Sequence, residues 1–192
     1  GKELIIKNLA LHYIMISPIY ISLVDKNDNI TGSEEKLLVH QKGLLHRAFS
    51  IIVYNRNGEM LIHQRALHKY HSGGLWTNAC CGHPNEGETM EAATHRRLEE
   101  EMGFDCPLDL KFKFHYHAKF DNGLTENEMD HVYVGEFNND FVFNPEEVAD
   151  YKWVDVDFVQ NDVENNPDNY TVWFREILQQ EAFEGGMAVV RA

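Results

Sequence analysis

The stretch "GHPNEGETMEAATHRRLEEEMGF", residues 82–104, carries the clearest structural pattern in the chain. Its middle predicts a helix from about Thr89 to Met102, which stops at Gly103, a residue suited to the position just after a helix. The residues that recur at every fourth position along it are Met90, Thr94, Leu98 and Met102. The stretch therefore predicts a helix between two loops, with one face turned to a core.

The charged residues of this stretch follow a spacing of their own. From Gly82 onward the chain contains G-x5-E-x7-R-x-L-x-E-E-x-G-F, which resembles the Nudix box, the loop–helix–loop signature of diphosphate-processing enzymes. Its members here are Gly82, Glu88, Arg96, Leu98, Glu100, Glu101, Gly103 and Phe104. Helical carboxylates supply oxygen ligands for a hard cation such as Mg²⁺, which can bridge phosphates. A solvated acidic helix face is the alternative, and we prefer it for Glu91 and Glu99.

One position departs from the pattern of the Nudix hydrolases. They carry Arg-Glu where this chain has Arg96-Arg97. The change removes a carboxylate ligand and adds a cation that can contact phosphate. It favours binding a diphosphate intact over hydrolysing it.

The rest of the chain mixes strands with helices. Single strands are expected at 19–24, 129–137 and 151–159, and a further strand at 111–120, where apolar and polar residues alternate. A hairpin is expected at 47–66, with its turn at Asn57-Gly58. A second helix is expected over 170–183, after a polar loop at 160–169. This order predicts an α+β fold, which we expect to be a Nudix-like mixed β-sheet sandwich flanked by helices. We expect an N-terminal extension over 1–18 and a single Nudix-like domain over 19–192.

Composition limits the partners. The chain has 192 residues and a formal net charge of −14, which argues against nucleic acid or an anionic membrane. Residues 4–24 are apolar, but polar residues and a proline interrupt them, so an edge strand or helix is preferred to a membrane anchor. Three cysteines are too few for a disulfide framework and favour a reducing, cytoplasmic setting.

A second motif, "WTNACCGHP" at 76–84, places two thiols beside an imidazole. In an extended segment, residues two apart point the same way, so Cys81 and His83 share one side and Cys80 faces the other. Cys80 is then a small core residue, and Cys81 is the thiol available for chemistry.

Histidines and carboxylates elsewhere can join His83. His40 and His46 lie in and after "KLLVHQKGLLHRAFS", and the period of two places Glu126 and Glu128 of "TENEMD" on one face. Three imidazoles and two carboxylates can enclose one divalent cation, such as Mn²⁺, Zn²⁺ or Mg²⁺. The histidines expected at the surface or in the core instead are His12, His63, His68, His71, His95, His115, His117 and His131.

Together, "GLLHRAFS", "WTNACCGHP", the altered box and "ENE" resemble the type I isopentenyl-diphosphate isomerases from about residue 19 to 180. The resemblance implies conversion of isopentenyl diphosphate to dimethylallyl diphosphate in isoprenoid biosynthesis. It implies catalytic roles for Cys81, Glu128, Tyr116 and Trp173. It implies diphosphate binding by Lys36, Arg65, Lys69 and Arg97. It implies a metal site formed by His40, His46, His83, Glu126 and Glu128, and a second ion, Mg²⁺, held by Glu101 and the substrate.

The implied reaction explains why these residue types are needed. Protonating the alkene creates a tertiary carbocation, which requires a dry aromatic pocket and the π face of Trp173. An acid and a base must flank the alkene, and Glu128 and Cys81 are the pair. The resemblance implies that the glutamate side protonates the terminal carbon and the cysteine removes the allylic proton. Nearby cations are expected to favour the thiolate of Cys81.

Two other functions stay open from the residues. One is a Nudix hydrolase of a nucleoside diphosphate derivative, against which Arg97 and Cys81 count. The other is a catalytically silent Nudix-like domain that binds a ligand or a partner protein. We expect a small-molecule diphosphate as the partner and a monomer or weak dimer as the assembly.

Overall fold

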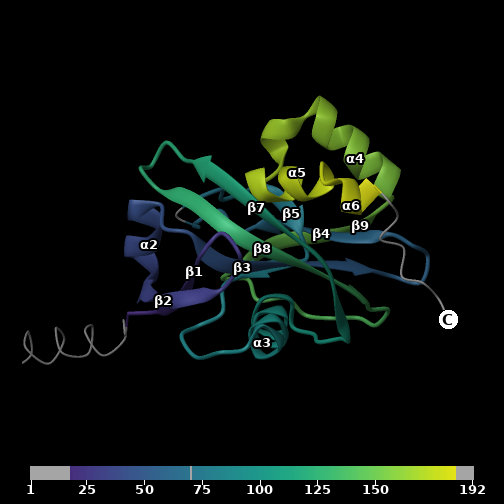
Figure 1. The fold of residues 1–192 in the computed structure, drawn as a ribbon. Helices are drawn as coiled ribbons and strands as arrows, with labels where there is room; N and C mark the ends of the chain where they lie inside the picture. Colours follow the sequence, from purple (N-terminus) through teal and green to yellow (C-terminus); the bar gives the residue numbers. More distant parts are fainter. Residues whose placement is uncertain (1–17, 70, 185–192) are drawn as a thin grey trace, which may run out of the picture.

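The computed structural model describes residues 18–69 and 71–184, and within them nine strands form one sheet (Figure 1). The strands are β1 Tyr20–Val24, β2 Ile30–Glu35, β3 His46–Tyr54, β4 Met60–Arg65, β5 Trp76–Asn78, β6 Cys80–Gly82, β7 Leu108–Lys119, β8 Thr125–Glu136 and β9 Val148–Val154. The helices are α2 Lys36–Lys42, α3 Met90–Met102, α4 Val156–Asn165, α5 Val172–Leu178 and α6 Glu181–Glu184, with a short 3₁₀ turn, η1, at Pro167–Asn169.

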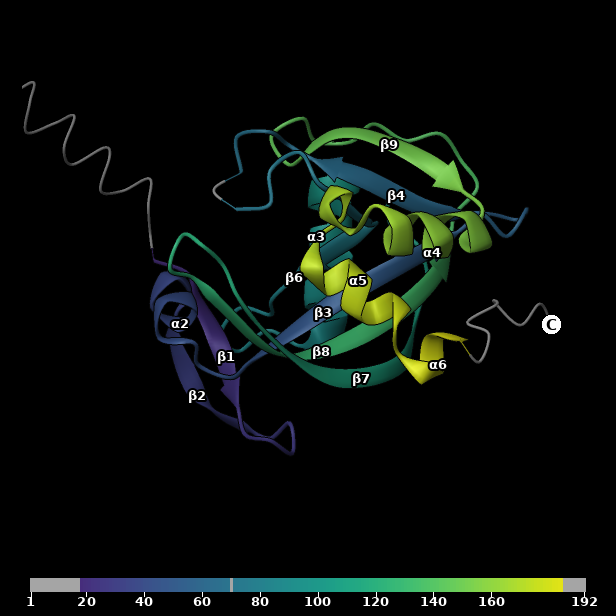
Figure 2. The same cartoon turned by 90° about the horizontal axis from the view of Figure 1, so that it is seen from above.

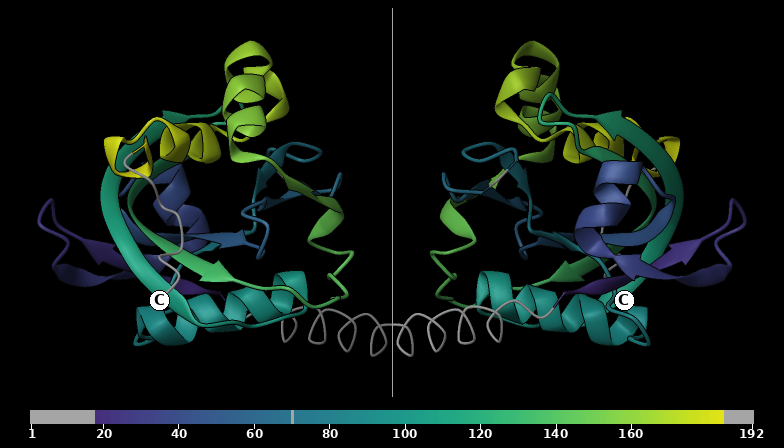
Figure 3. Two further views of the ribbon diagram at one scale, coloured as in Figure 1. Left: turned by 90° about the vertical axis from the view of Figure 1, so that its right-hand side faces the viewer. Right: turned by 90° about the vertical axis from the view of Figure 1, so that its left-hand side faces the viewer.

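Strand β3 is central to the sheet. It pairs antiparallel with β1, β4 and β6 and parallel with β8, so the sheet is mixed, as expected. The β7–β8 hairpin extends the sheet from β8, while β9 pairs with β4. Figure 3 shows that β7 and β8 curl upward from the level of α3 toward α4, α5 and α6.

Helices cover both faces of this sheet. Helix α3 lies on one face, and α4, α5 and α6 lie on the other (Figure 2). The period of two along β3 serves both layers: Phe49 and Ile51 pack in the core under α3, whereas Ile52 and Tyr54 pack in the core under α5. The expected α+β sandwich flanked by helices is therefore confirmed.

Helix α3 forms where the sequence predicts it. Thr89 caps it by accepting a hydrogen bond from the backbone of Ala92. Gly103 follows the last turn with φ of 75°, and a Cβ there would lie 1.9 Å from the carbonyl oxygen of Val142. Only glycine fits this position without a clash. Leu98 is fully buried, which fixes the inward face of the helix.

The expected hairpin at 47–66 is confirmed as β3 and β4, and the alternating run at 111–120 lies in β7. The strand expected over 151–159 is wrong at its end, because β9 stops at Val154 and α4 begins at Val156. The polar segment at 160–169, expected as a loop, is largely α4. Val159 and Val163, four residues apart, face the core and give the helix its apolar side.

The helix expected over 170–183 is divided into α5 and α6. Strands β2, β5 and β6 and helix α2 were not predicted, because they are short and their pairing depends on distant residues. Residues 1–17, most of the expected extension, lie outside the described part of the chain. Among the described residues, none of the helices has the length and apolar character that crossing a bilayer requires.

Candidate active site

A cavity of about 700 Å³ is lined by residues from both sides of the sheet. Residues from α2, α3, α5 and several strands line it, because the curl of β7 and β8 brings their ends toward β6 and α2. The sequence-predicted residues that line it are Lys36, His40, Arg65, Lys69, Cys81, His83, Arg97, Glu101, Tyr116, Glu126, Glu128 and Trp173. Of the predicted set, only His46 is absent from the lining; it lies fully buried in the cluster described next.

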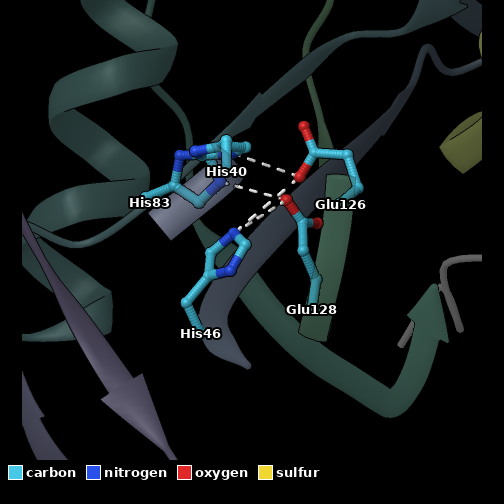
Figure 4. Close-up of side chains that lie close together, drawn as sticks. All are labelled: His40, His46, His83, Glu126 and Glu128. Atoms are coloured by element: carbon cyan, nitrogen blue, oxygen red, sulfur yellow. Dashed lines mark hydrogen bonds and ion pairs between the residues drawn. The ribbon is translucent and has the colours of Figure 1, made fainter. Parts of the chain in front are cut away.

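Three imidazoles and two carboxylates meet at one end of the cavity (Figure 4). They are His40, His46, His83, Glu126 and Glu128, and one ligand atom from each lies within 4.8 Å of all the others. Their elements explain the meeting: β8 carries both glutamates on one face, and His46 on the parallel β3 is in register with Glu128. The expected grouping of these residues is therefore present.

The cluster has the chemistry of a cation site. The Nδ1 atoms of His40 and His46 lie 2.7 Å and 2.9 Å from the carbonyl oxygens of Lys36 and Leu44. A neutral imidazole bonded in this way keeps its proton on Nδ1, so its Nε2 presents a lone pair. These Nε2 atoms face carboxylate oxygens at 3.3 Å, His40 toward Glu126 and His46 toward Glu128. Lone pairs that converge in this way fit a bound cation.

The burial of the two carboxylates increases the need for a bound cation. Glu126 is 4% exposed and Glu128 is 7% exposed. Burial and the neighbouring charge of Glu128 raise the pKa of Glu126. The Nε2 of His46 and one oxygen of Glu126 are buried without a hydrogen-bond partner. Two like charges held this close are costly unless a positive charge lies between them, so the residues fit a divalent metal.

Cationic side chains form a second group in the wall of the cavity. Lys36, Arg65, Lys69 and Arg97 all line it. Burial, together with the charges of Arg97 and Lys69, lowers the pKa of the Lys36 ammonium. Neighbouring cations thus disfavour the charged form of Lys36, and a bound anion would relieve this repulsion, so the group suits an anion. The alternative for Lys36, a solvated surface charge, does not match its place in the cavity wall.

Helix α3, which carries the Nudix-box pattern, contributes Arg97 to this cationic group. The guanidinium of Arg97 donates to Glu100 at 2.9 Å and to the buried Glu101 at 2.8 Å. Burial raises the pKa of Glu101, although Arg97 opposes the rise. Glu88 instead bonds Arg96 and fixes the loop before the helix. Glu91 and Glu99 are exposed, as expected for a solvated face.

The two adjacent cysteines point to opposite sides of the sheet, as predicted. Cys80 is fully buried in the core under α3, and Cys81 contacts the core under α5 and lines the cavity. The sulfur of Cys81 lies 3.4 Å from the hydroxyl oxygen of Ser50 and 3.4 Å from the side-chain oxygen of Asn78. Cys81 therefore has defined partners in the cavity wall.

The expectation that cations keep Cys81 as a thiolate is wrong for this geometry. Burial and the charge of Asp130 raise the pKa of the Cys81 thiol far above its ordinary value. The groups nearest the sulfur are the neutral side chains of Ser50 and Asn78 and the acidic Asp130. Cys81 therefore carries its proton at neutral pH.

Aromatic rings close the cavity near Cys81. Tyr116 on β7 is in register with Glu128 on β8, and both are buried. Burial and the charge of Glu128 raise the pKa of Tyr116, so its hydroxyl stays protonated. Trp173 is 5% exposed, and its indole ring lies 5.1 Å from the guanidinium carbon of Arg65. The ring thus contacts a cation already and can face another.

Several cavity residues were missed from the sequence, and Glu147 and His71 are two of them. Glu147 forms an ion pair with Lys69 and lies 3.6 Å from Arg97. His71, expected at the surface or in the core, instead lines the cavity, with its ring 5.8 Å from that of Trp173. Both lie in irregular segments whose position depends on tertiary contacts, so no local pattern marks them.

Comparison with known proteins supports this description. Residues 44–175 match the model of the NUDIX domain. The chain is 54% identical over 162 residues to isopentenyl-diphosphate Delta-isomerase 2 of Photorhabdus laumondii, covering 84% of this chain and 92% of that one. It is 48% identical over 157 residues to an isopentenyl-diphosphate Delta-isomerase of Serratia proteamaculans, covering 82% and 88%.

A solved structure, DR0079 of Deinococcus radiodurans, shares the fold with a TM-score of 0.69 at 17% identity, covering 83% of this chain and 97% of that one. The domain match spans more than half of the chain, and the two relatives are matched over most of their length. The chain therefore belongs to the Nudix superfamily and, within it, to the family of type I isopentenyl-diphosphate Delta-isomerases.

Proposed function

We propose that this chain isomerises isopentenyl diphosphate to dimethylallyl diphosphate by protonation and deprotonation. The observation that carries the proposal is one shared cavity, lined by Cys81, Tyr116, Glu128 and Trp173. A sulfur and a carboxylate in one closed space, beside aromatic rings, are the groups that moving a C=C bond requires. The names of the relatives support the same reaction for this chain.

The chain's own residues divide the chemistry. The protonated thiol of Cys81 and the carboxylate of Glu128 form a pair in which one member gives a proton and the other takes one. Because the isomerisation is reversible, each member is the acid in one direction and the base in the other. A protonated Cys81 thiol can donate a proton, so Cys81 is the acid in the direction of the reaction that starts from this state. Tyr116, with its hydroxyl proton retained, assists transfer at Glu128.

The carbocation between these two steps must not meet water. Trp173 and Tyr116 are buried, and their rings exclude solvent from this end of the cavity. The π face of Trp173 stabilises the positive centre, an interaction worth about 2 kcal/mol when water is excluded.

Diphosphate binding falls to the cationic group of the cavity wall. Lys36, Arg65, Lys69 and Arg97 would hold the anion, with Arg97 positioned by Glu101. Mg²⁺ bound by Glu101 together with the diphosphate would neutralise phosphate charge. The large negative charge of the whole protein is thus offset locally.

The His/Glu cluster is proposed to bind one divalent cation, Mn²⁺, Zn²⁺ or Mg²⁺. Mixed imidazole and carboxylate ligands suit all three, with imidazole favouring the first two over Mg²⁺. When bound, the metal would fix the position of Glu128 and offset the two buried carboxylates. His40 and His46 would bind through Nε2 while the Nδ1 of each stays on a backbone carbonyl.

We also propose a cytoplasmic enzyme that works as a monomer or weak dimer. All three cysteines are free, which suits a reducing compartment. The net charge of −14 disfavours nucleic acid and anionic membranes as partners.

The test measures both candidate products in one assay. The purified chain is incubated with Mg²⁺ and isopentenyl diphosphate, and in parallel with nucleoside diphosphate derivatives. We expect the dimethylallyl isomer and no released phosphate or mononucleotide. Phosphate release without isomer would favour the hydrolase, and metal-dependent binding without turnover would favour the silent binding domain.

A further inference from the structure

Ser50 lies against the proposed catalytic sulfur and has no role so far. It sits on β3 and is in register with Cys81 on the antiparallel β6. Residues directly opposite each other in an antiparallel pair point to the same face, so the backbone itself places the hydroxyl beside the thiol. Ser50 is 1% exposed, and both residues line the cavity.

The hydroxyl of Ser50 is held in one orientation. It donates a 2.7 Å hydrogen bond to Oδ2 of Asp130, which is 1% exposed. Since its only hydrogen is used there, the Ser50 oxygen can act toward the sulfur only as an acceptor. The Cys81 thiol is 3.4 Å away, within the range for a bond from sulfur.

The other partner of the sulfur is less specific. Nδ2 of Asn78 lies 3.3 Å from the sulfur but also donates to the carbonyls of Ile51 and Cys80 at 3.1 Å and 2.9 Å. Asn78 therefore holds the backbone of this segment together. The contacts of the Ser50 hydroxyl described here are with one carboxylate and the sulfur. Substituting Ser50 therefore tests the position of the thiol more specifically than substituting Asn78.

We propose that Ser50 is a positioning residue that aims the Cys81 sulfur at the substrate and is itself held by Asp130. The inference rests on the proposed function. Ser50 neither gains nor loses a proton: the proton that moves passes between the sulfur and a substrate carbon. Asp130 fixes the serine rotamer, the serine fixes the thiol rotamer, and the sulfur is kept at the distance that transfer needs. A displacement of about 1 Å at such a site lowers the rate about 100-fold.

The test compares three substitutions at Ser50, which differ in side-chain shape and in whether the hydroxyl is kept. Ser50→Ala removes the hydroxyl, Ser50→Thr keeps it, and Ser50→Val has the shape of threonine without it. We expect kcat to fall about 10- to 100-fold in the alanine and valine variants, with KM within the range of the wild type, and to recover in the threonine variant. Ser22→Ala, a buried strand serine on β1 outside the cavity lining, is the control and should keep full activity.

Deuterium exchange at the two substrate carbons distinguishes a misplaced Cys81 sulfur from a general loss of active-site structure. In D₂O, the wild type should place deuterium at both substrate carbons in step with isomerisation. If Ser50 acts through Cys81 alone, then in Ser50→Ala, starting from the isomer that Glu128 protonates, exchange at the carbon that Glu128 serves outruns net isomerisation, because the carbocation returns to that isomer on the Glu128 side. Equal slowing at both carbons, or equal losses in the threonine and valine variants, would overturn the inference.

The two failures are distinguishable. A wild type that forms no dimethylallyl isomer contradicts the proposed function itself. A wild type that isomerises normally, with a Ser50→Ala variant of unchanged kcat, contradicts only the role of Ser50.

Discussion

The two faces of the central sheet are built from adjacent residues of the same strands but have different contents. On the α3 face, Cys80 packs with Leu98 and other apolar side chains in a closed core. On the α5 face, Cys81 lies beside a cavity that also contains buried carboxylates and imidazoles. Because successive side chains of a strand point to opposite faces, one thiol packs in the core and its neighbour lines the cavity.

The difference shows where stability and activity are located. The α3 face buries apolar surface, which favours folding at about 25 cal/mol per Å². The cavity end of the α5 face buries His46 and Glu126 with unpartnered atoms, which is unfavourable in the folded chain until an ion is bound. Substitutions on the first face should lower stability, and substitutions at the cavity should lower turnover.

The largest effect is expected from the proton-transfer pair. Cys81→Ala and Glu128→Gln should each lower kcat about 1,000-fold or more, because each removes one of two proton-transfer groups. Circular dichroism and thermal unfolding should show folded protein in both. Turnover at the wild-type level in either variant would remove that residue from the mechanism.

The next effect tests the aromatic wall. Trp173→Leu should lower kcat about 30-fold, since the stabilisation of the cation by the indole is lost. The matched control is Trp153→Leu, because Trp153 packs against the core under α3. That variant should lose stability and keep its kcat. Equal kcat losses in the two variants would contradict the separation of the faces.

A smaller effect is expected at the cationic group of the cavity wall. Arg97→Gln should raise KM for isopentenyl diphosphate about 10-fold, because one charge-assisted hydrogen bond to the diphosphate is lost. Arg97→Lys keeps the charge and should recover part of the affinity. An unchanged KM in Arg97→Gln, measured by initial rates, would place the diphosphate elsewhere.

On the opposite face, Leu98→Ala should lower the free energy of unfolding by about 2–5 kcal/mol, because it leaves a cavity in a core with no space to spare. Urea unfolding measures this change. The kcat of the folded variant should match that of the wild type. A large loss of kcat without a loss of stability would show that α3 packing controls the chemistry directly.

The smallest effect belongs to the neighbouring thiol. Cys80→Ala should cost about 1 kcal/mol of stability, the value of one buried apolar atom group. Its turnover should stay at the wild-type level, in contrast to Cys81→Ala. Equal inactivation of the two variants would mean that the sheet does not separate the cysteines as described.

Local patterns predicted much of this molecule. The helix ending at Gly103 and the opposite directions of Cys80 and Cys81 follow from rules that act within a few residues, and the structure has both. The grouping of His46 with Glu128 was considered from the residue types and then implied by the family resemblance, and the parallel register of β3 and β8 accounts for it.

Tertiary packing decided the rest. The first residues of helix α4 were expected as the end of a strand and the rest as a loop, because asparagines and aspartates favour turns, yet Val159 and Val163 pack on the core and stabilise the helix. Glu147 and His71 reach the cavity from irregular segments that distant strands position. The raised pKa of Cys81 depends on burial and on Asp130, 49 positions away in the sequence, so the local motif suggested the opposite ionisation state.

The most direct test follows the substrate by proton NMR in D₂O, with the purified chain, isopentenyl diphosphate and Mg²⁺. We expect the dimethylallyl isomer to appear with deuterium in its methyl group, because the proton added to the terminal carbon comes from an exchangeable group of the enzyme. Unchanged substrate, or an isomer without deuterium, would contradict proton transfer between the enzyme groups, Cys81 and Glu128, and the substrate carbons.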